Sequence, residues 1–141
     1  MGALTFARIL AAVAAQEGTT PEALRGPSVM GGYSEGNEPR HRALMLARRL
    51  LPTVSWHALA REMGRTSRNV TDQARLGEAR YARDPDEQLK VLGVLARLGL
   101  GELPPYDDRQ WRRAKLDGEI RRVEAQLAAL RARRAELGEA A

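Results

Sequence analysis

The sequence predicts an all-α protein, with a helical domain over residues 1–102, a proline-containing linker over 103–106 and a long amphipathic helix over 107–141. Two observations support this class. Ala and Leu supply most of the apolar 43% of the 141 residues, whereas aromatic residues make up only 4%. Apolar side chains also recur at helical spacing, and few β-branched runs could form a sheet. We therefore expect helices throughout.

The first quarter of the chain predicts two helices and a loop. Apolar side chains at helical spacing predict a helix over residues 4–16. Residues 20–22 (TPE) predict a short second helix, because a capping hydroxyl precedes a proline at the first helical position. That helix is expected to end near Gly26. Residues 26–39 are rich in Gly, Ser and Pro without periodicity, which predicts a mobile loop.

The next segment predicts two further helices. One is expected from Arg40 to Leu51, because Pro52 stops it. We expect this helix to bury one face and to expose arginine on the other. Ser55 can cap the following helix, which runs to Met63. The apolar face of the first of these helices comprises Leu44, Ala47, Leu50 and Leu51.

Two longer helices complete the predicted domain. After Gly64, either Thr66 or Ser67 can cap a helix that reaches about Ala82. Residues 84–87 (DPDE) combine a cap, a proline and first-turn acids, which predicts another helix start. That last helix ends at Gly99 and is apolar on most sides, so we expect it to pack into the core.

Residues 56–75 match the pattern of a helix-turn-helix. The motif needs a small residue where its helices cross, a glycine in the turn and an aliphatic in the second helix. Ala60, Gly64 and Val70 occur at that spacing, and Leu59 and Met63 fill inward positions of the first helix. The departures from the pattern are Arg65 and Gln73, where aliphatic residues are usual. A plain helical hairpin with a chance glycine is the alternative interpretation.

In a helix-turn-helix the start of the second helix enters the major groove of DNA. Arg68 could bind guanine through two hydrogen bonds, and Asn69 could bind adenine. The residues expected to face the bases are Thr66, Ser67, Arg68, Asn69 and Asp72.

The positive charge of the chain is concentrated around this motif. The net charge is +5, and residues 39–80 alone carry nine basic and three acidic side chains. A solvated helical surface could produce the same excess. We nevertheless expect phosphate contacts, which position a protein on DNA without reading its sequence. The expected phosphate contacts are Arg48, Arg49, Arg61 and Arg75.

Several short segments occur in a characteristic order along the chain: Val13-Ala14, 20–26, 40–42, 47–48, 55–65, Val70 and Asp84-Pro85. Over residues 9–98 this order resembles the C-terminal DNA-binding domain of DnaA-type replication initiators and of small phage or prophage proteins. The resemblance implies that Arg40 and Arg42 reach into the minor groove, and that residues 65–69 contact the major groove. The family's Asp-His-Thr-Thr base-reading run is replaced here by residues 66–69, so the initiator's own DNA box is not the expected target. A P-loop for ATP is also missing.

The last helix has apolar residues that alternate four and three apart, which is typical of a coiled-coil seam. A surface helix lying on the domain's own core would show a similar stripe. An antiparallel pair would place Glu119 near Arg133 and Asp117 near Arg131, whereas a parallel pair would place Glu119 near Glu124, so we favour the antiparallel orientation. The residues expected to mediate oligomerisation are Leu116, Ile120, Val123, Leu127, Leu130 and Leu137.

Together these patterns predict a double-stranded DNA-binding protein that forms a homo-oligomer or meets a partner protein through its last helix. We expect a phage- or prophage-derived transcription regulator. The alternatives are a DNA-packaging adaptor similar to a small terminase subunit, a replication-origin binder and a protein-interaction module. The chain has no cysteine, no recognisable nucleophile–base pair and no apolar run of membrane-spanning length. We therefore expect no enzyme activity, no cofactor, no metal, no membrane partner and a cytoplasmic, nucleoid-associated location.

Overall fold

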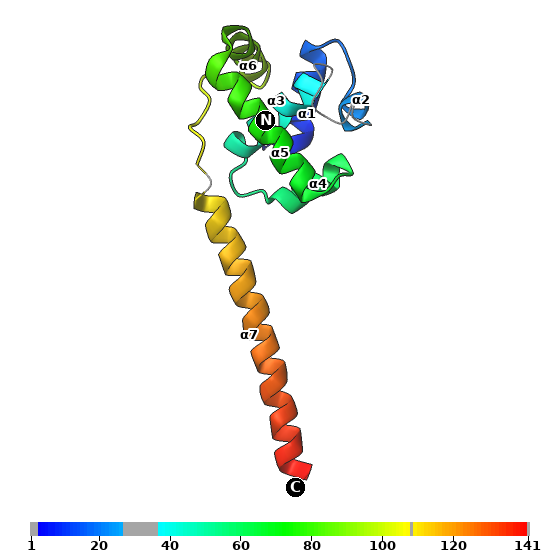
Figure 1. Ribbon diagram of the computed structural model, residues 1–141, viewed down its shortest axis with the longest axis vertical. Coiled ribbons are helices and arrows are strands. Elements are labelled where there is room, and N and C mark those ends of the chain that lie inside the picture. Colours follow the sequence, from blue (N-terminus) through cyan, green and yellow to red (C-terminus); the bar gives the residue numbers. More distant parts are fainter. Residues whose placement is uncertain (1–2, 27–36, 108, 141) are drawn as a thin grey trace. The chain divides into compact units, whose positions relative to one another are not determined.

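The computed structural model describes residues 3–26, 37–107 and 109–140, and these residues form helices and connecting segments without a strand. The predicted all-α class is therefore confirmed (Figure 1). The chain divides into two units, Met1–Asp108 and Arg109–Ala141. None of the described helices is long and apolar enough to cross a membrane. The helices are α1 (Phe6–Gln16), α2 (Pro21–Arg25), α3 (Glu38–Leu50), α4 (Trp56–Met63), α5 (Ser67–Arg83), α6 (Pro85–Arg97) and α7 (Arg109–Ala140).

The predicted starts of α2, α4, α5 and α6 agree with the structure because side-chain caps set them locally. The hydroxyl of Thr20 accepts a hydrogen bond from the backbone N–H of the residue three positions later, and Ser55 and Thr66 do the same. Thr66, not Ser67, is therefore the cap of α5. The carboxylate of Asp84 accepts from the N–H of Asp86 at the start of α6.

The loop predicted over residues 26–39 falls mostly on residues 27–36, which lie outside the described residues. Its expected end was slightly wrong, because α3 begins at Glu38 instead of Arg40. Pro39 lies in the first turn of α3, where its missing N–H leaves no hydrogen bond unmade.

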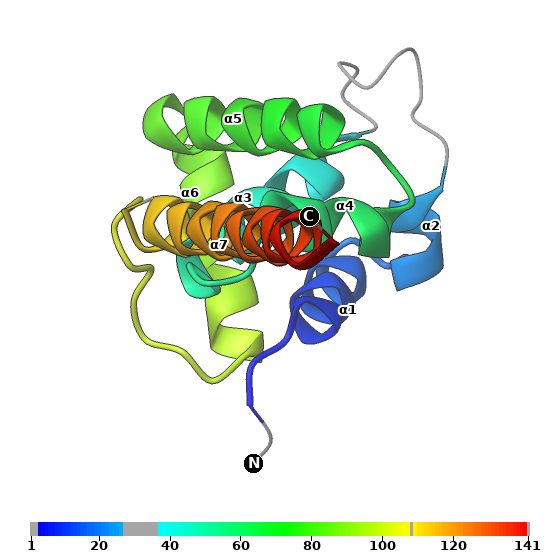
Figure 2. The same cartoon turned by 90° about the horizontal axis from the view of Figure 1, so that it is seen from below.

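Helix α3 is the centre of the N-terminal unit. It contacts α1, α2 and α5, and Figure 2 shows it between α1 and α5. Every residue from Arg40 to Arg48 is buried. The prediction that α3 exposes an arginine face is therefore wrong. The run Leu44-Met45-Leu46 already places apolar side chains on all sides of one helical turn.

A glycine lets α5 approach α3 closely. A Cβ atom at Gly77 would lie 2.4 Å from the backbone oxygen of His41 and 2.9 Å from the Cβ of Met45. Any side chain at this position would therefore push the two helices apart, and α3 would lose its enclosure on that side.

Helix α6 buries one face only. Val91, Val94 and Leu95 are buried, as expected for a helix that contacts α1 and α5. Leu89 and Leu92 are exposed on the other side. The prediction that α6 is enclosed on most sides is therefore only half right, because its neighbours cover a single face.

Candidate nucleic-acid interface

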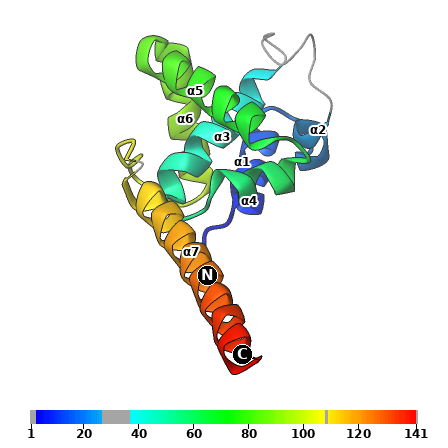
Figure 3. The ribbon, with the colours of Figure 1, turned by 60° about the horizontal axis from the view of Figure 1, so that its bottom comes forward.

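Helices α4 and α5 are joined by a three-residue turn. The connection between the two helices can be seen in Figure 3. Gly64 ends α4 with φ +66°, in the left-handed region that favours glycine, as the sequence predicted. The backbone N–H of Arg65 then donates to the carbonyl oxygen of Ala60 at 2.9 Å. Thr66 caps α5 directly afterwards. The turn is therefore fixed by its own local hydrogen bonds.

The inward positions predicted for this pair of helices are confirmed. Leu59, Ala60 and Met63 of α4 and Val70 of α5 are all buried, and the two helices contact each other. Gln73, one of the two departures from the sequence pattern, is buried as well. Its Nε2 donates to Oδ1 of Asn69 at 2.5 Å, so a polar side chain occupies the place of the usual aliphatic.

Arg65, the other departure, is half-buried and packs toward the end of α2. Its Nη2 donates to the carbonyl oxygen of Gly26. Arg40 donates to the same oxygen. Two guanidinium groups therefore meet at the end of α2, and Arg65 is less available to the major groove than predicted.

The first turns of α5 present the remaining predicted base-reading residues to solvent. Arg68 is exposed, as is Thr66, while Ser67, Asn69 and Asp72 are half-exposed. The Oγ1 of Thr66 accepts from the helix backbone, and Oδ1 of Asn69 accepts from Gln73. Arg68 is therefore the one long side chain among these five residues that is exposed.

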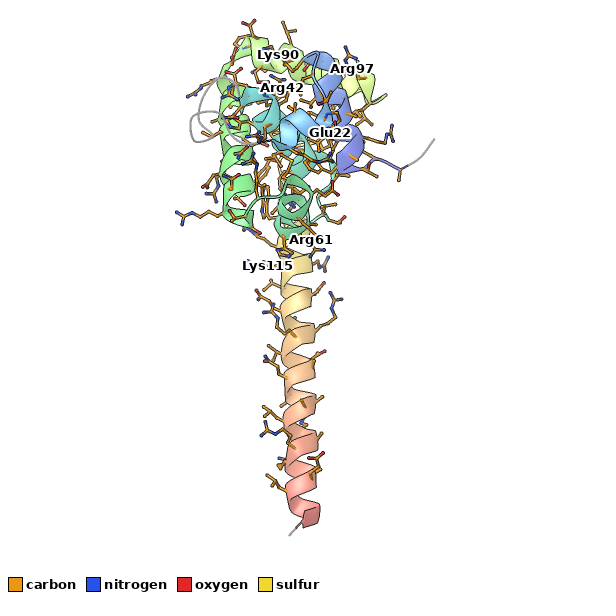
Figure 4. All side chains as sticks on the ribbon, turned by 90° about the vertical axis from the view of Figure 1, so that its right-hand side faces the viewer. Glu22, Arg42, Arg61, Lys90, Arg97 and Lys115 are labelled. Atoms are coloured by element: carbon orange, nitrogen blue, oxygen red, sulfur yellow. The ribbon has the colours of Figure 1, made fainter. Side chains whose placement is uncertain are left out.

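Two other predicted DNA contacts are also accessible. Arg61 of α4 is exposed, and Figure 4 shows it at the periphery of the N-terminal unit. The side chain of Arg75 on α5 is 78% exposed and lies 3.9 Å from a carboxylate oxygen of Asp72. Exposed ion pairs of this kind are weak, so Arg75 can exchange Asp72 for a phosphate.

The expectation that Arg40 reaches into the minor groove is wrong for this structure. Its side chain is buried and donates to the carbonyl oxygens of Leu24 and Gly26, both at 2.7 Å, and to Oδ1 of Asn37 at 3.1 Å. Burial, together with the charge of Arg65, lowers the pKa of Arg40 to about 10. Arg40 holds the end of α2 onto the start of α3.

Arg42 was the second expected minor-groove contact, and it is only 1% exposed. Its Nε and Nη2 donate to both carboxylate oxygens of Glu87 at 2.6 and 2.9 Å, and its Nη1 donates to Glu17 at 2.8 Å. Burial acts to lower the pKa of Arg42, but the hydrogen bonds and charges of the two carboxylates outweigh it and raise the pKa. Figure 4 shows Arg42 among the helices that it connects.

Arg48 and Arg49, expected to contact phosphates, also bind within the protein. Arg48 is 1% exposed, donates to the carbonyl oxygens of Pro52 and Val54 at 2.9 Å each, and lies 4.7 Å from the ring centre of Trp56. The expected phosphate contact of Arg48 is therefore wrong. Arg48 holds the segment that leads into α4.

Arg49 binds α5 in a similar way, so its expected phosphate contact is wrong as well. It forms two parallel hydrogen bonds with the carboxylate of Glu78, at 2.8 and 2.7 Å, and a third with the carbonyl oxygen of Pro104 at 3.1 Å. The hydrogen bonds with Glu78 raise the pKa of Arg49 against the effect of burial. Its guanidinium also lies 5.2 Å from the ring centre of Tyr81.

Sequence reasoning missed this structural use of arginine. The partners Glu17, Glu78 and Glu87 lie 25 to 45 residues from the arginines that they bind, and no local pattern connects them. The charge count of residues 39–80 therefore overestimated the basic surface. The expected contacts that remain accessible are Arg61, Thr66, Ser67, Arg68, Asn69, Asp72 and Arg75, with Arg65 half-buried.

Comparison of the chain with family models, with curated proteins and with solved structures gave no match. The resemblance to the DnaA domain therefore stays a prediction.

Proposed function

We propose that this protein binds double-stranded DNA in a sequence-dependent manner, with the first turns of α5 in the major groove. One observation carries the proposal: Arg68 is exposed at the start of a helix whose opposite face is buried against α3 and α4. A helix-turn-helix presents its second helix to DNA in this way.

The chemistry of the accessible residues fits this role. Arg68 can donate two hydrogen bonds to guanine, while Ser67 and the amide of Asn69 lie on the same helical end and can reach neighbouring bases. The positive end of the α5 dipole favours a phosphate nearby. Arg61 and Arg75 add charge on either side of the turn and fit phosphate contacts.

For the biological role we favour transcription regulation by a protein of phage or prophage type, acting at the nucleoid. A packaging adaptor is the second candidate, because the exposed apolar seam of α7 could also build a ring. The mass of the assembly distinguishes the two roles: a dimer supports a regulator, and a ring of many subunits supports an adaptor.

The test begins with selection of a preferred duplex from random sequences. Binding of Arg68→Ala to that duplex and to a scrambled one is then measured by fluorescence anisotropy. Loss of a bidentate base contact costs roughly 1–3 kcal/mol, so we expect affinity for the selected duplex to fall about 5- to 150-fold. Affinity for the scrambled duplex should change far less.

Arg83→Ala is the matched control, because Arg83 is an exposed arginine at the other end of the same helix. We expect its specificity to equal that of the unmodified protein. Equal losses in both variants would contradict the placement of α5, and absence of duplex binding at low salt would contradict DNA binding itself.

A further inference from the structure

Helix α7 carries an apolar seam that its own unit leaves uncovered. The six side chains of the seam are between 44% and 73% exposed. They follow one another at intervals of four and three residues from Leu116 to Leu130, which keeps them on one side of the helix. Such a strip is the surface that a second helix of matching pattern covers. The side chains are Leu116, Ile120, Val123, Leu127, Leu130 and Leu137.

We propose that the occupant is α7 of a second copy, paired antiparallel so that Ile120 lies on Leu130 of the second copy and Val123 on its Leu127. Two-fold symmetry repeats each contact, which gives four consecutive apolar layers at the centre of the pair. The same register places residues whose numbers sum to about 250 opposite each other along the whole helix.

The charges beside the seam favour this orientation. The antiparallel register pairs Glu119 with Arg133 and Asp117 with Arg131, and two-fold symmetry makes each pair occur twice. It creates a single like-charge contact, between Glu124 and Glu124 of the second copy. A parallel pair would keep Arg112 near Asp117 but would set Glu119 against Glu124 twice. The antiparallel arrangement therefore makes more opposite-charge contacts.

The arginine that interrupts the seam supports the same orientation independently. Arg134 follows Leu130 by four residues and precedes Leu137 by three, so it occupies a seam position. In the antiparallel register Arg134 lies opposite Leu116, where its aliphatic stem packs and its guanidinium extends to solvent. A parallel pair would place the two Arg134 side chains face to face.

This pairing has a consequence for DNA that rests on the proposed function. Helix α7 has 32 residues and is therefore about 48 Å long. In an antiparallel pair the two Arg109 ends, to which the N-terminal units are attached, lie at opposite ends of that length. The dimer is therefore built to connect two separated DNA segments, whereas a parallel pair would bring both units to the same end.

Chemical cross-linking of the full chain tests the orientation without DNA. The chain contains no cysteine, so single cysteines can be introduced cleanly. A mixture of Glu119→Cys with affinity-tagged Arg133→Cys should give a heterodimer with a short bis-maleimide. The matched mixture of Glu119→Cys with tagged Glu124→Cys should not, because these positions approach only in the parallel pair. The reverse result overturns the proposal.

Sedimentation equilibrium of the unmodified chain tests self-association itself. We expect twice the 15.6 kDa monomer mass. Leu127→Glu should give a monomer, while Ala125→Glu, on the opposite side of α7, should remain a dimer. A monomeric unmodified chain at 100 µM, or any larger closed assembly, would overturn the antiparallel pair.

The bridging consequence is measured with one immobilised and one labelled duplex, both carrying the selected sequence. The unmodified protein should retain the labelled duplex, and Leu127→Glu should not, although its affinity for one duplex stays unchanged. If the unmodified protein does not bind even one duplex, the proposed function fails and the antiparallel dimer is unaffected. An intact antiparallel dimer that binds one duplex but retains no second one overturns the bridging inference.

Discussion

The arginines of α3 and the exposed arginines of α4 and α5 are close in sequence but lie in opposite environments. Arg42 and Arg48 of α3 are 1% exposed, whereas the side chain of Arg75 on α5 is 78% exposed. The α3 group binds carbonyl and carboxylate oxygens inside the protein. In α4 and α5, by contrast, Arg61, Arg68 and Arg75 face solvent. A local excess of basic residues therefore describes composition and does not by itself describe a basic surface.

The position of α3 explains the difference. Because α3 contacts α1, α2 and α5, side chains on nearly every side of it meet another part of the unit. A planar guanidinium has five donors and can satisfy several oxygens at once, so arginine suits such a central helix better than lysine. Arg48 and Arg49 hold the segment before α4 and the middle of α5. The buried group therefore positions the exposed group.

The largest expected effect comes from Arg42→Met. This change leaves the buried carboxylate of Glu87 without its two hydrogen bonds. Loss of one partner of a buried ion pair costs about 3–5 kcal/mol in the free energy of unfolding. Urea denaturation followed by circular dichroism measures it.

Two controls sharpen this experiment. Arg68→Met should change the free energy of unfolding by at most about 0.5 kcal/mol, because its side chain is exposed. Adding Glu87→Leu to Arg42→Met should restore part of the lost stability, since no unpaired charge is then buried. Equal stability of both single variants would break the distinction between the two arginine groups.

A smaller effect is expected from Arg48→Ala. The carbonyl oxygens of Pro52 and Val54 lose their donor, and Trp56 loses the guanidinium beside its ring. We expect a loss of about 1–3 kcal/mol in the free energy of unfolding. The salt dependence of DNA binding should stay unchanged when it is measured at a temperature where the variant is folded. A reduced salt dependence would show that Arg48 reaches a phosphate after all.

The smallest effect on stability, and a clear one on binding, is expected from Arg61→Gln. Removal of one phosphate contact should reduce the slope of log affinity against log salt concentration by about one, equally for selected and scrambled duplexes. The melting temperature should not change, because Arg61 is exposed. Salt titrations by fluorescence anisotropy give the slope. An unchanged slope would remove Arg61 from the interface.

Much of the fold and part of the site followed from local sequence patterns. The capping residues Thr20, Ser55 and Asp84 and the left-handed Gly64 agree with the structure. The burial of Val70 on the inner side of α5 agrees as well. The covering of α6 on one face only could not be predicted, because it depends on which helices pack beside it.

The sequence alone therefore determined the helices, most of their ends and the turn between α4 and α5, because caps and backbone angles depend on residues within about four positions. Only the tertiary structure decided which arginines remain outside. Arg42 binds Glu17 and Glu87, and Arg49 binds Glu78, across 25 to 45 residues of chain. Burial of a charged group depends on whether packing brings such a partner to it, and no local pattern records that.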